Sequence, residues 1–401
     1  MLGYYFELAW RALRRQRALT ALMVLALGLG IGACMTTLTV YHVLSGDPIP
    51  SKSDRLFDVE LDAASRLGWE PGQEPGLQLT RLDAEELLRQ HRAVRQVMMS
   101  GGNLPVMPET PGVKPVYVPA RLASADFFAM FDAPFLRGGG WDAAADAAQA
   151  RVAVIARELA EHLFGSTDVV GRDIVLRGQH FRVIGVLDTW HPSPHYYDLT
   201  MGTYAQQEQV YLPFSTALAM KFGSSGNMNC WGSPAAGDAR SVGAPCAWIQ
   251  YWVELARPAD AAAFRQYLVR YSEDQARAGR FERPPNARLR NVMDWLVQRK
   301  ALPGDVTLQV WLAFGFLLVC IVNTVGLLLA KCLRRAPEIG VRRALGASRR
   351  EIFAQFLVEA GAIGLAGGVL GLVLSWAGVW LVRQGTSDSA QWVHMDAVAL
   401  V

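Results

Sequence analysis

Residues 334–351 read RRAPEIGVRRALGASRRE, a basic stretch that lies between two long apolar segments of the chain. Pro337 suits the first turn of a helix, and Glu338 follows it where the helix dipole favours an anion. Gly346 is placed to end this helix, and Ser348, with a glutamate three residues later, is typical of a capping box that begins the next one. The stretch therefore predicts a short basic helix, a tight turn and a second helix that continues into an apolar segment. On these residues alone, the short helix is either a docking element for a partner or a basic patch that binds anionic lipid.

Three long apolar segments accompany this stretch, at residues 20–44, 306–330 and 355–382. Glu359 is the single Asp, Glu, Lys or Arg within them. A helix of 25 residues is about 37 Å long, which is enough to cross a hydrocarbon core of about 30 Å. Buried core helices and the apolar region of a signal peptide are both shorter. We therefore expect three membrane spans, with Glu359 paired to a nearby arginine or reaching the interface.

Charge asymmetry sets the expected orientation. Residues 1–17 contain four arginines and one glutamate, and residues 331–351 contain seven basic and two acidic residues. The long segment 46–305 contains 27 basic and 30 acidic residues. The positive-inside rule therefore places the first two regions in the cytoplasm and the long segment outside.

Composition and motifs exclude several classes of protein. Of the 401 residues, 51% are hydrophobic and 19% are charged, with a net charge of +3. This is too apolar for a disordered chain and gives no sign of a nucleic-acid binder. None of the five lysines completes a Walker A loop, and neither a Gly-x-Ser-x-Gly elbow nor a His-Glu-x-x-His pair is present. The sequence therefore predicts a non-catalytic chain that binds no cofactor of its own.

The outside segment is expected to fold as a mixture of helices and strands in two subdomains. A helix over 259–278 carries Phe264, Leu268 and Tyr271 on one stripe. Further helices are expected at 83–91 and 158–164, and strands at 151–155, 173–176, 181–186, 210–212 and 248–255.

Cys230 and Cys246 are the only cysteines of the outside segment. They flank a loop rich in Gly, Ser and Ala, and an oxidising compartment permits a disulfide between them. We expect this bond. Two separate buried thiols are the alternative.

His180, His191 and His195 lie close together in the sequence, with Asp188 and Asp198 nearby. A metal site would need three or four such ligands to converge. The prolines between His191 and His195 rule out a helical spacing that would put both rings on one face. We therefore expect these histidines to be surface loop residues and predict no metal site.

The chain ends in a short apolar run, 397–401, preceded by Trp392 and Asp396. Five residues cannot cross a bilayer. We interpret this run as the beginning of a truncated fourth span. The alternative is a three-span protein whose C-terminus lies outside.

Glycine pairs within the apolar segments favour close helix contacts. Gly28 and Gly32 are four residues apart, and similar pairs occur at 364–368 and 367–371. We assign Gly28 and Gly32 to the interface between two subunits. Asn323, in the second apolar segment, is expected to hydrogen-bond across helices.

The chain resembles the macrolide-exporter (MacB-like) permeases of the FtsX superfamily. The motif at 338–348 and the span residues 322–329 carry this resemblance most specifically. A basic N-terminal helix at 6–16 and the exterior stretches 122–128, 134–139 and 152–187 extend it over nearly the whole chain. By their positions in the motif, seven residues would form or shape the contact with an ATPase: Glu338, Ile339, Gly340, Arg342, Arg343, Leu345 and Gly346.

The resemblance implies a helical transmembrane domain with four spans and a large α+β periplasmic domain inserted between spans one and two. The corresponding layout is an N-terminal helix and span 1 at 1–45, the periplasmic domain at 46–305, span 2 at 306–332, the coupling helix at 333–352, span 3 at 353–383 and a truncated span 4 at 384–401.

The resemblance also implies a function and partners. The chain would be the permease of an ABC transporter in the bacterial inner membrane, moved by two copies of a cytoplasmic ATPase that bind ATP and Mg²⁺. A second permease, identical or paralogous, and a periplasmic adaptor are further implied partners, besides membrane lipid. The alternative is an FtsX-type regulator that relays the state of the ATPase to a periplasmic cell-wall hydrolase.

Overall fold

The computed structural model describes residues 17–108, 114–234, 237–302, 304–346 and 348–383. The chain forms two compact units. We call Asp47–Ala301 the sheet unit, and Met1–Gly46 with Leu302–Val401 the helical unit.

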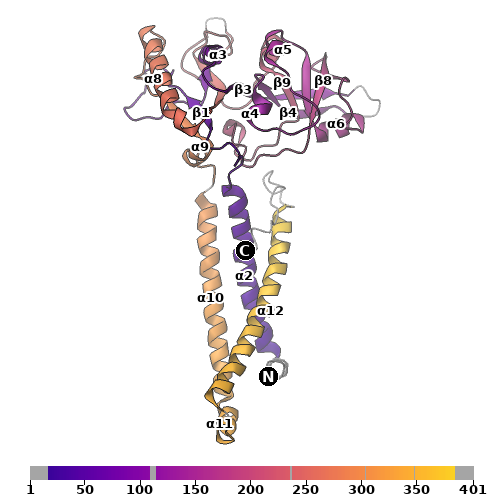
Figure 1. The fold of residues 1–401 in the computed structure, drawn as a ribbon, viewed down its shortest axis with the longest axis vertical. Helices are drawn as coiled ribbons and strands as arrows, with labels where there is room; N and C mark the ends of the chain where they lie inside the picture. The colour runs from indigo at the N-terminus through magenta and orange to yellow at the C-terminus, as the bar shows by residue number, and fades with distance from the viewer. Residues whose placement is uncertain (1–16, 109–113, 235–236, 303, 347, 384–401) are drawn as a thin grey trace. The chain divides into compact units, whose positions relative to one another are not determined.

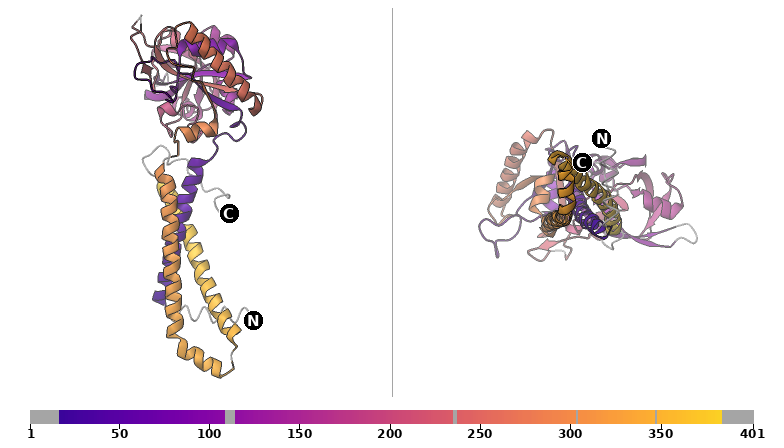
Figure 2. Two further views of the ribbon diagram at one scale, coloured as in Figure 1. Left: turned by 90° about the vertical axis from the view of Figure 1, so that its left-hand side faces the viewer. Right: turned by 90° about the horizontal axis from the view of Figure 1, so that it is seen from below.

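The helical unit is built on three long helices, α2 (Arg17–Ser45), α10 (Gly304–Arg334) and α12 (Arg349–Arg383). In the described part of the chain, these three are long and apolar enough to cross a membrane. Helix α2 packs against both α10 and α12, and Figure 1 shows it between them. The short α11 (Ala336–Ala344) joins α10 to α12, as the left panel of Figure 2 shows. The fourth span and the helix expected at 6–16 lie outside the described residues.

The sheet unit contains one continuous mixed sheet in the order β12-β1-β11-β3-β4-β9-β6-β8-β5, with β2 and β10 on β11 and β7 on β3 and β8. Only the pairs β4–β9 and β6–β8 are parallel among the described strands. The strands are β1 (Leu56–Glu60), β2 (Leu79–Thr80), β3 (Arg95–Met107), β4 (Val116–Ala123), β5 (Phe135–Gly138), β6 (Val152–Ala156), β7 (Asp173–Leu176), β8 (Gln179–Leu187), β9 (Val210–Pro213), β10 (Asn229–Cys230), β11 (Cys246–Glu254) and β12 (Arg288–Asn291).

Seven α-helices accompany the described strands of this sheet. They are α3 (Arg81–Gln90), α4 (Phe127–Met130), α5 (Ala143–Ala147), α6 (Arg157–Phe164), α7 (Phe214–Ala219), α8 (Ala261–Arg277) and α9 (Val292–Gln298). In α8 the predicted stripe of Phe264, Leu268 and Tyr271 is buried. Each helix and strand expected from the sequence in this segment is present, with ends shifted by at most two residues.

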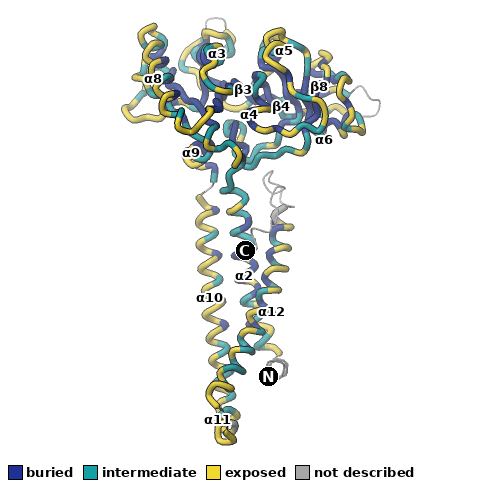
Figure 3. The backbone as a smooth tube through the Cα atoms, viewed as in Figure 1, coloured by how far each residue is buried: buried dark blue, intermediate teal, exposed yellow. Residues whose placement is uncertain are grey.

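The core of the sheet unit consists of two hydrophobic clusters. Neighbouring side chains of a strand, which alternate in direction, can belong to different clusters. Along β11, Val253 belongs to one cluster and Trp252 to the other. Figure 3 shows the strands largely in the buried colour. The second cluster is rich in aromatic rings, and Phe127 makes edge contacts with Phe131 and Tyr197.

Residues Asp47–Ala301 form one of the two compact units, and a division of this unit into two subdomains stays a prediction. Strand β3 is 13 residues long and pairs with β11 at one end and with β4 and β7 at the other. One strand thereby ties both halves of the sheet together, which the sequence pattern did not reveal.

Candidate functional site

The candidate site is the segment from the end of α10 to the beginning of α12. The predicted coupling residues Glu338, Ile339, Gly340, Arg342 and Arg343 lie in α11, and Leu345 and Gly346 follow directly. Pro337 stands in the first turn, as expected.

Local interactions close both ends of the turn that follows α11. Gly346 has a φ of +100°, a left-handed conformation that glycine adopts without strain. The amide of Ser348 donates to Glu351 Oε2 at 2.9 Å, and the amide of Glu351 donates to Ser348 Oγ at 3.3 Å. This reciprocal pair is the predicted capping box. Gly346 and the capping box thus mark where α11 ends and where α12 begins.

The surface of α11 combines charge with exposed apolar side chains. Leu345 is 82% exposed and Val341 is 62% exposed, with Arg343 exposed beside them. Figure 3 shows α11 mostly in the exposed colour. Apolar side chains with a flanking arginine are typical of protein docking surfaces. A helix of nine residues is marginal in isolation, so its position depends on its connections to the long helices.

A buried ion cluster supplies one of these connections. Lys331, in the last turns of α10, donates a hydrogen bond to Glu359 of α12. Arg335, the residue at the N-terminal cap of α11, donates to Glu359 Oε2 at 3.5 Å. The side chains of Lys331 and Glu359 are 1% and 2% exposed. We call Lys331, Arg335 and Glu359 the Glu359 cluster; it ties α10, α11 and α12 together at one end of the helical unit.

The prediction that Glu359 pairs with a nearby arginine is confirmed by its contact with Arg335. The sequence analysis missed Lys331, which precedes Glu359 by 28 residues. Its position at the end of an apolar segment was the available signal, because a cation there needs a partner when two helices converge.

Gly28 and Gly32 lie in the contact between α2 and α12. A Cβ at Gly28 would meet Leu370 Cδ2 at 2.7 Å, and a Cβ at Gly32 would meet Leu374 Cβ at 2.8 Å. Their assignment to an interface between two subunits is therefore corrected, because this face of α2 is occupied within the chain. The small residues do allow close helix approach, as their spacing predicts.

Asn323 is exposed on α10, whereas its neighbour Thr324 is buried and donates to the carbonyl of Cys320 at 2.8 Å. The expected hydrogen bond from Asn323 to another helix is not found among the described helices. The helical turn directs Thr324 inward and leaves Asn323 on the outer side.

The sheet unit contains a second buried ion cluster that the sequence analysis missed. Arg121, on β4, is fully buried and donates to Asp198 Oδ2 at 2.5 Å and to Glu208 Oε1 at 2.8 Å. His195 Nε2 lies 3.2 Å from Glu208 Oε2, and the Tyr197 hydroxyl donates to the same oxygen at 2.8 Å. We call Arg121, Asp198, Glu208, His195 and Tyr197 the Arg121 cluster. Burial alone would raise the pKa of the Glu208 carboxyl, but the charges and hydrogen bonds of Arg121 and His195 hold it well below its usual value.

The expectation of surface histidines is wrong for His195, which is 2% exposed. His180 is exposed on β8, and His191 Nε2 lies 3.8 Å from Glu158. Among the described residues, no three or more His, Cys, Asp or Glu side chains are grouped so that they could hold a metal ion.

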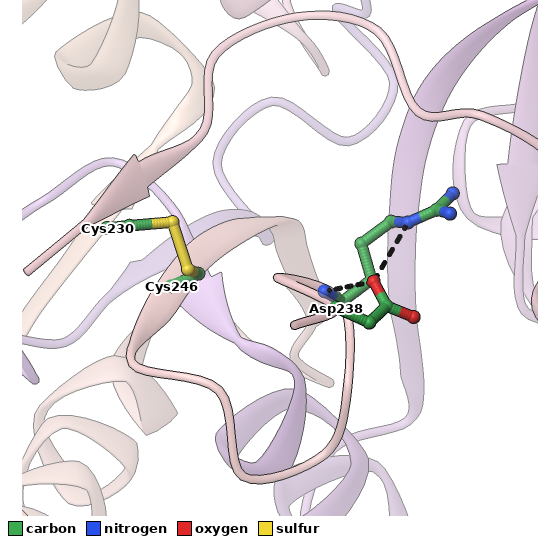
Figure 4. The surroundings of a disulfide bond; sticks show 4 residues. Cys230, Asp238 and Cys246 are labelled. Carbon is green, nitrogen blue, oxygen red and sulfur yellow. Dashed lines mark hydrogen bonds and ion pairs between the residues drawn. A yellow bond between two sulfur atoms is a disulfide. The ribbon is translucent and has the colours of Figure 1, made fainter. Parts of the chain in front are cut away.

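Cys230 and Cys246 form a disulfide in the structure, the same pair that the sequence predicts. Figure 4 shows this bond at the base of the loop that carries Asp238. Cys34, Cys320 and Cys332 are free thiols.

Comparison with protein families gives two matches. The model of the MacB-like periplasmic core domain matches residues 20–271, and the model of the FtsX-like permease C-terminal domain matches residues 310–400.

Individual relatives are more distant. The macrolide export ATP-binding/permease protein MacB of Rhodospirillum rubrum is 28% identical over 391 residues, which cover 93% of this chain and 52% of that protein. The pyoverdine export ATP-binding/permease protein PvdT of Pseudomonas entomophila is 25% identical over 370 residues, which cover 92% of this chain and 51% of that protein. The chain thus spans about half the length of these relatives.

Among solved structures, the periplasmic region of MacB from Actinobacillus actinomycetemcomitans is similar to this chain. It is 12% identical, with a TM-score of 0.41, over 63% of this chain and 94% of that chain.

Proposed function

The chain belongs to the MacB-like permeases of the FtsX superfamily, and on that premise we propose that it is the membrane-embedded permease of an ABC transporter. It works by mechanotransmission: ATP binding and hydrolysis by a cytoplasmic ATPase move α11, and the long helices pass this motion to the sheet unit. The sheet unit handles a substrate that is exported or extracted from the periplasm or the outer leaflet. In this proposal α2, α10 and α12 are spans one to three, and a fourth span follows α12.

The observation that carries the proposal is the construction of α11. Its surface is exposed and mixed in character, its following turn is closed by a glycine and a capping box, and the Glu359 cluster links it to two long helices. A rigid, anchored docking helix can transmit a displacement, whereas a lipid-binding patch needs no such anchor.

We assign ATP and Mg²⁺ to the ATPase partner, because residues 1–401 contain no Walker A loop. Two ATPases and a second permease, identical or paralogous, complete the complex, with a periplasmic adaptor as a further partner. Export is favoured over relay to a cell-wall hydrolase because the similar proteins MacB and PvdT are named as exporters.

Affinity purification tests the proposal directly. The protein is purified from its own bacterium in mild detergent, and the proteins that accompany it are identified and counted by mass spectrometry. We expect a cassette ATPase in a one-to-one ratio with the permease. Reversing two charges of the docking helix, Glu338→Lys with Arg343→Glu, removes that ATPase.

A matched reversal on an exposed helix of the sheet unit, Arg270→Glu with Glu273→Lys in α8, retains the ATPase. Absence of an ATPase from the wild-type sample would refute the proposal. Equal loss from both double variants would refute the role of α11.

A further inference from the structure

Asp58 is an acidic side chain in the interior of the sheet unit. It lies on β1 and is 2% exposed. Its Oδ2 atom is buried and has no hydrogen-bond partner among the described residues. Burial without a partner costs a carboxylate far more than it costs a neutral carboxyl group, because the ion loses its hydration. A side chain in such a position avoids this cost by binding a proton.

Aromatic side chains cover the face of the sheet on which Asp58 lies. Asp58 is paired in register with Trp252 of β11, and directly opposite residues of neighbouring strands share a face. The ring centre of Trp252 lies 6.4 Å from that of Trp295, on α9. The Trp295 indole N–H donates to the carbonyl of Tyr196 at 3.0 Å, which helps to hold α9 on this face. Hydration of an ionised Asp58 therefore favours displacement of α9.

Four charged groups from different segments act on Asp58. They are Glu60 on β1, Arg290 on β12, Arg299 after α9 and Asp198 before the short helix Leu199–Met201. Arg290 donates a hydrogen bond to Glu60, and Arg121 donates to Asp198 Oδ2 at 2.5 Å. The Arg299 guanidinium lies 5.5 Å from the ring centre of Trp295. Burial, followed by the charge of Glu60, raises the pKa of the Asp58 carboxyl well above its usual value, and the two nearby arginines reduce this shift.

We propose that Asp58 is a proton-dependent latch on α9 and β12. While Asp58 carries a proton, α9 stays closed on its face of the sheet. When Asp58 ionises, water enters and α9 and β12 separate locally from β1. In the chain, β1 is the first strand after α2, and β12 with α9 directly precedes α10. The consequence for transport rests on the function proposed above, whereas the latch itself is tested on this chain alone.

The direction of the pH dependence follows from proton linkage. In the open form Asp58 is exposed to water and ionises at its ordinary pKa of 3.8, whereas the closed form keeps the proton to a higher pH. Opening therefore releases a proton. The equilibrium constant for opening rises by up to tenfold per pH unit until Asp58 ionises in the closed form as well. This direction is opposite to that expected for Glu208, whose pKa is lowered.

Hydrogen exchange of the full chain in lipid nanodiscs, read by mass spectrometry, measures local opening. After correction for the intrinsic exchange rates, protection of residues 288–298 in the wild type should fall at least tenfold from about pH 5 to about pH 8. In Asp58→Asn, which cannot ionise, protection should stay constant over this range. Asp274→Asn, which removes an exposed carboxyl of α8, should keep the wild-type profile.

Infrared spectroscopy of the wild type detects the proton without a variant. Ordinary carboxyl groups are ionised at about pH 7, so a C=O band of a protonated carboxyl there reports a raised pKa. Isotopic labelling of the aspartate carboxyls should shift this band, and Asp58→Asn should reduce it. Constant protection of residues 288–298 in the wild type, an equal fall in Asp58→Asn, or absence of an aspartic acid band at about pH 7 would each overturn the proposal.

Discussion

The two buried ion clusters of the chain are inverse arrangements. In the sheet unit, one cation, Arg121, lies between two carboxylates, Asp198 and Glu208. In the helical unit, one carboxylate, Glu359, lies between two cations, Lys331 and Arg335. Each central group is nearly or fully buried. Loss of a central group leaves two like charges without compensation, whereas loss of a peripheral group leaves the central one still paired.

The surroundings of the clusters differ in a way that bears on function. The Arg121 cluster is enclosed by aromatic rings, and the Arg121 guanidinium lies 5.3 Å from the ring centre of Tyr197. The Glu359 cluster joins the exposed α11 to α10 and α12, two long helices that both pack against α2. We infer that the first cluster stabilises a fixed fold and that the second transmits motion.

The largest effect is expected from Arg121→Met. The substitution leaves Asp198 and Glu208 buried without their cation, which costs about 3–5 kcal/mol of unfolding free energy. Thermal and denaturant unfolding of the purified protein measure this loss. Arg121→Lys keeps the positive charge but loses the bidentate geometry of the guanidinium. Its free energy of unfolding should therefore lie between those of Arg121→Met and the wild type. A loss below 1 kcal/mol in Arg121→Met would contradict a structural role for the cluster.

The next effect concerns the glycine contact of the helical unit. In Gly32→Val the new side chain meets Leu374 and the backbone oxygen of Gly371, at 2.8 and 3.2 Å from the Cβ position. Overpacking of this kind costs about 1–3 kcal/mol. Detergent unfolding and a cysteine cross-link between α2 and α12 report the disruption.

Gly364→Val is the matched control, because a Cβ at Gly364 has nothing within 4 Å. It should leave the contact between α2 and α12 intact. Equal losses in both variants would show that helix propensity, rather than close packing, determines the effect.

The sequence predicted most elements of both units but neither the connected sheet nor the full ion clusters. Strand β6, helix α6 and the capping box at Ser348 follow from local patterns, which depend on residues only a few positions apart. Arg121 and Glu208 are separated by 87 positions, and no periodicity links them. The same limit applies to the pairing of Lys331 with Glu359. It also applies to Gly28 and Gly32, since a glycine pair in the sequence does not identify the helix that it contacts.

Lys331→Met is expected to reduce stability less than the substitutions above. Its effect on function should be larger than its effect on stability. Glu359 keeps Arg335 as its partner in this variant. The loss of unfolding free energy should therefore be about 1–2 kcal/mol, below the roughly 3–5 kcal/mol expected for a buried charge without a partner. ATPase activity of the reconstituted complex should nevertheless lose its dependence on the permease. A triple variant that replaces the whole cluster, Lys331→Met with Arg335→Met and Glu359→Leu, should regain stability without regaining coupling, which a purely structural cluster would not show.

The smallest effect is a pH dependence confined to the Arg121 cluster. The folded state holds the pKa of Glu208 below its unfolded value of 4.5, so the unfolded chain binds the proton first as the pH falls. The stability that Glu208 contributes is therefore present above about pH 4.5 and is lost as the pH falls below it, by up to about 1.4 kcal/mol per pH unit. Unfolding midpoints measured from pH 6 down to about pH 3 give the slope of stability against pH. Glu208→Gln should flatten this slope. Glu273→Gln, at an exposed position of α8, should leave it unchanged. Equal slopes in Glu208→Gln and the wild type would show that other carboxyl groups govern the acid response and that the Arg121 cluster does not set the stability of the sheet unit.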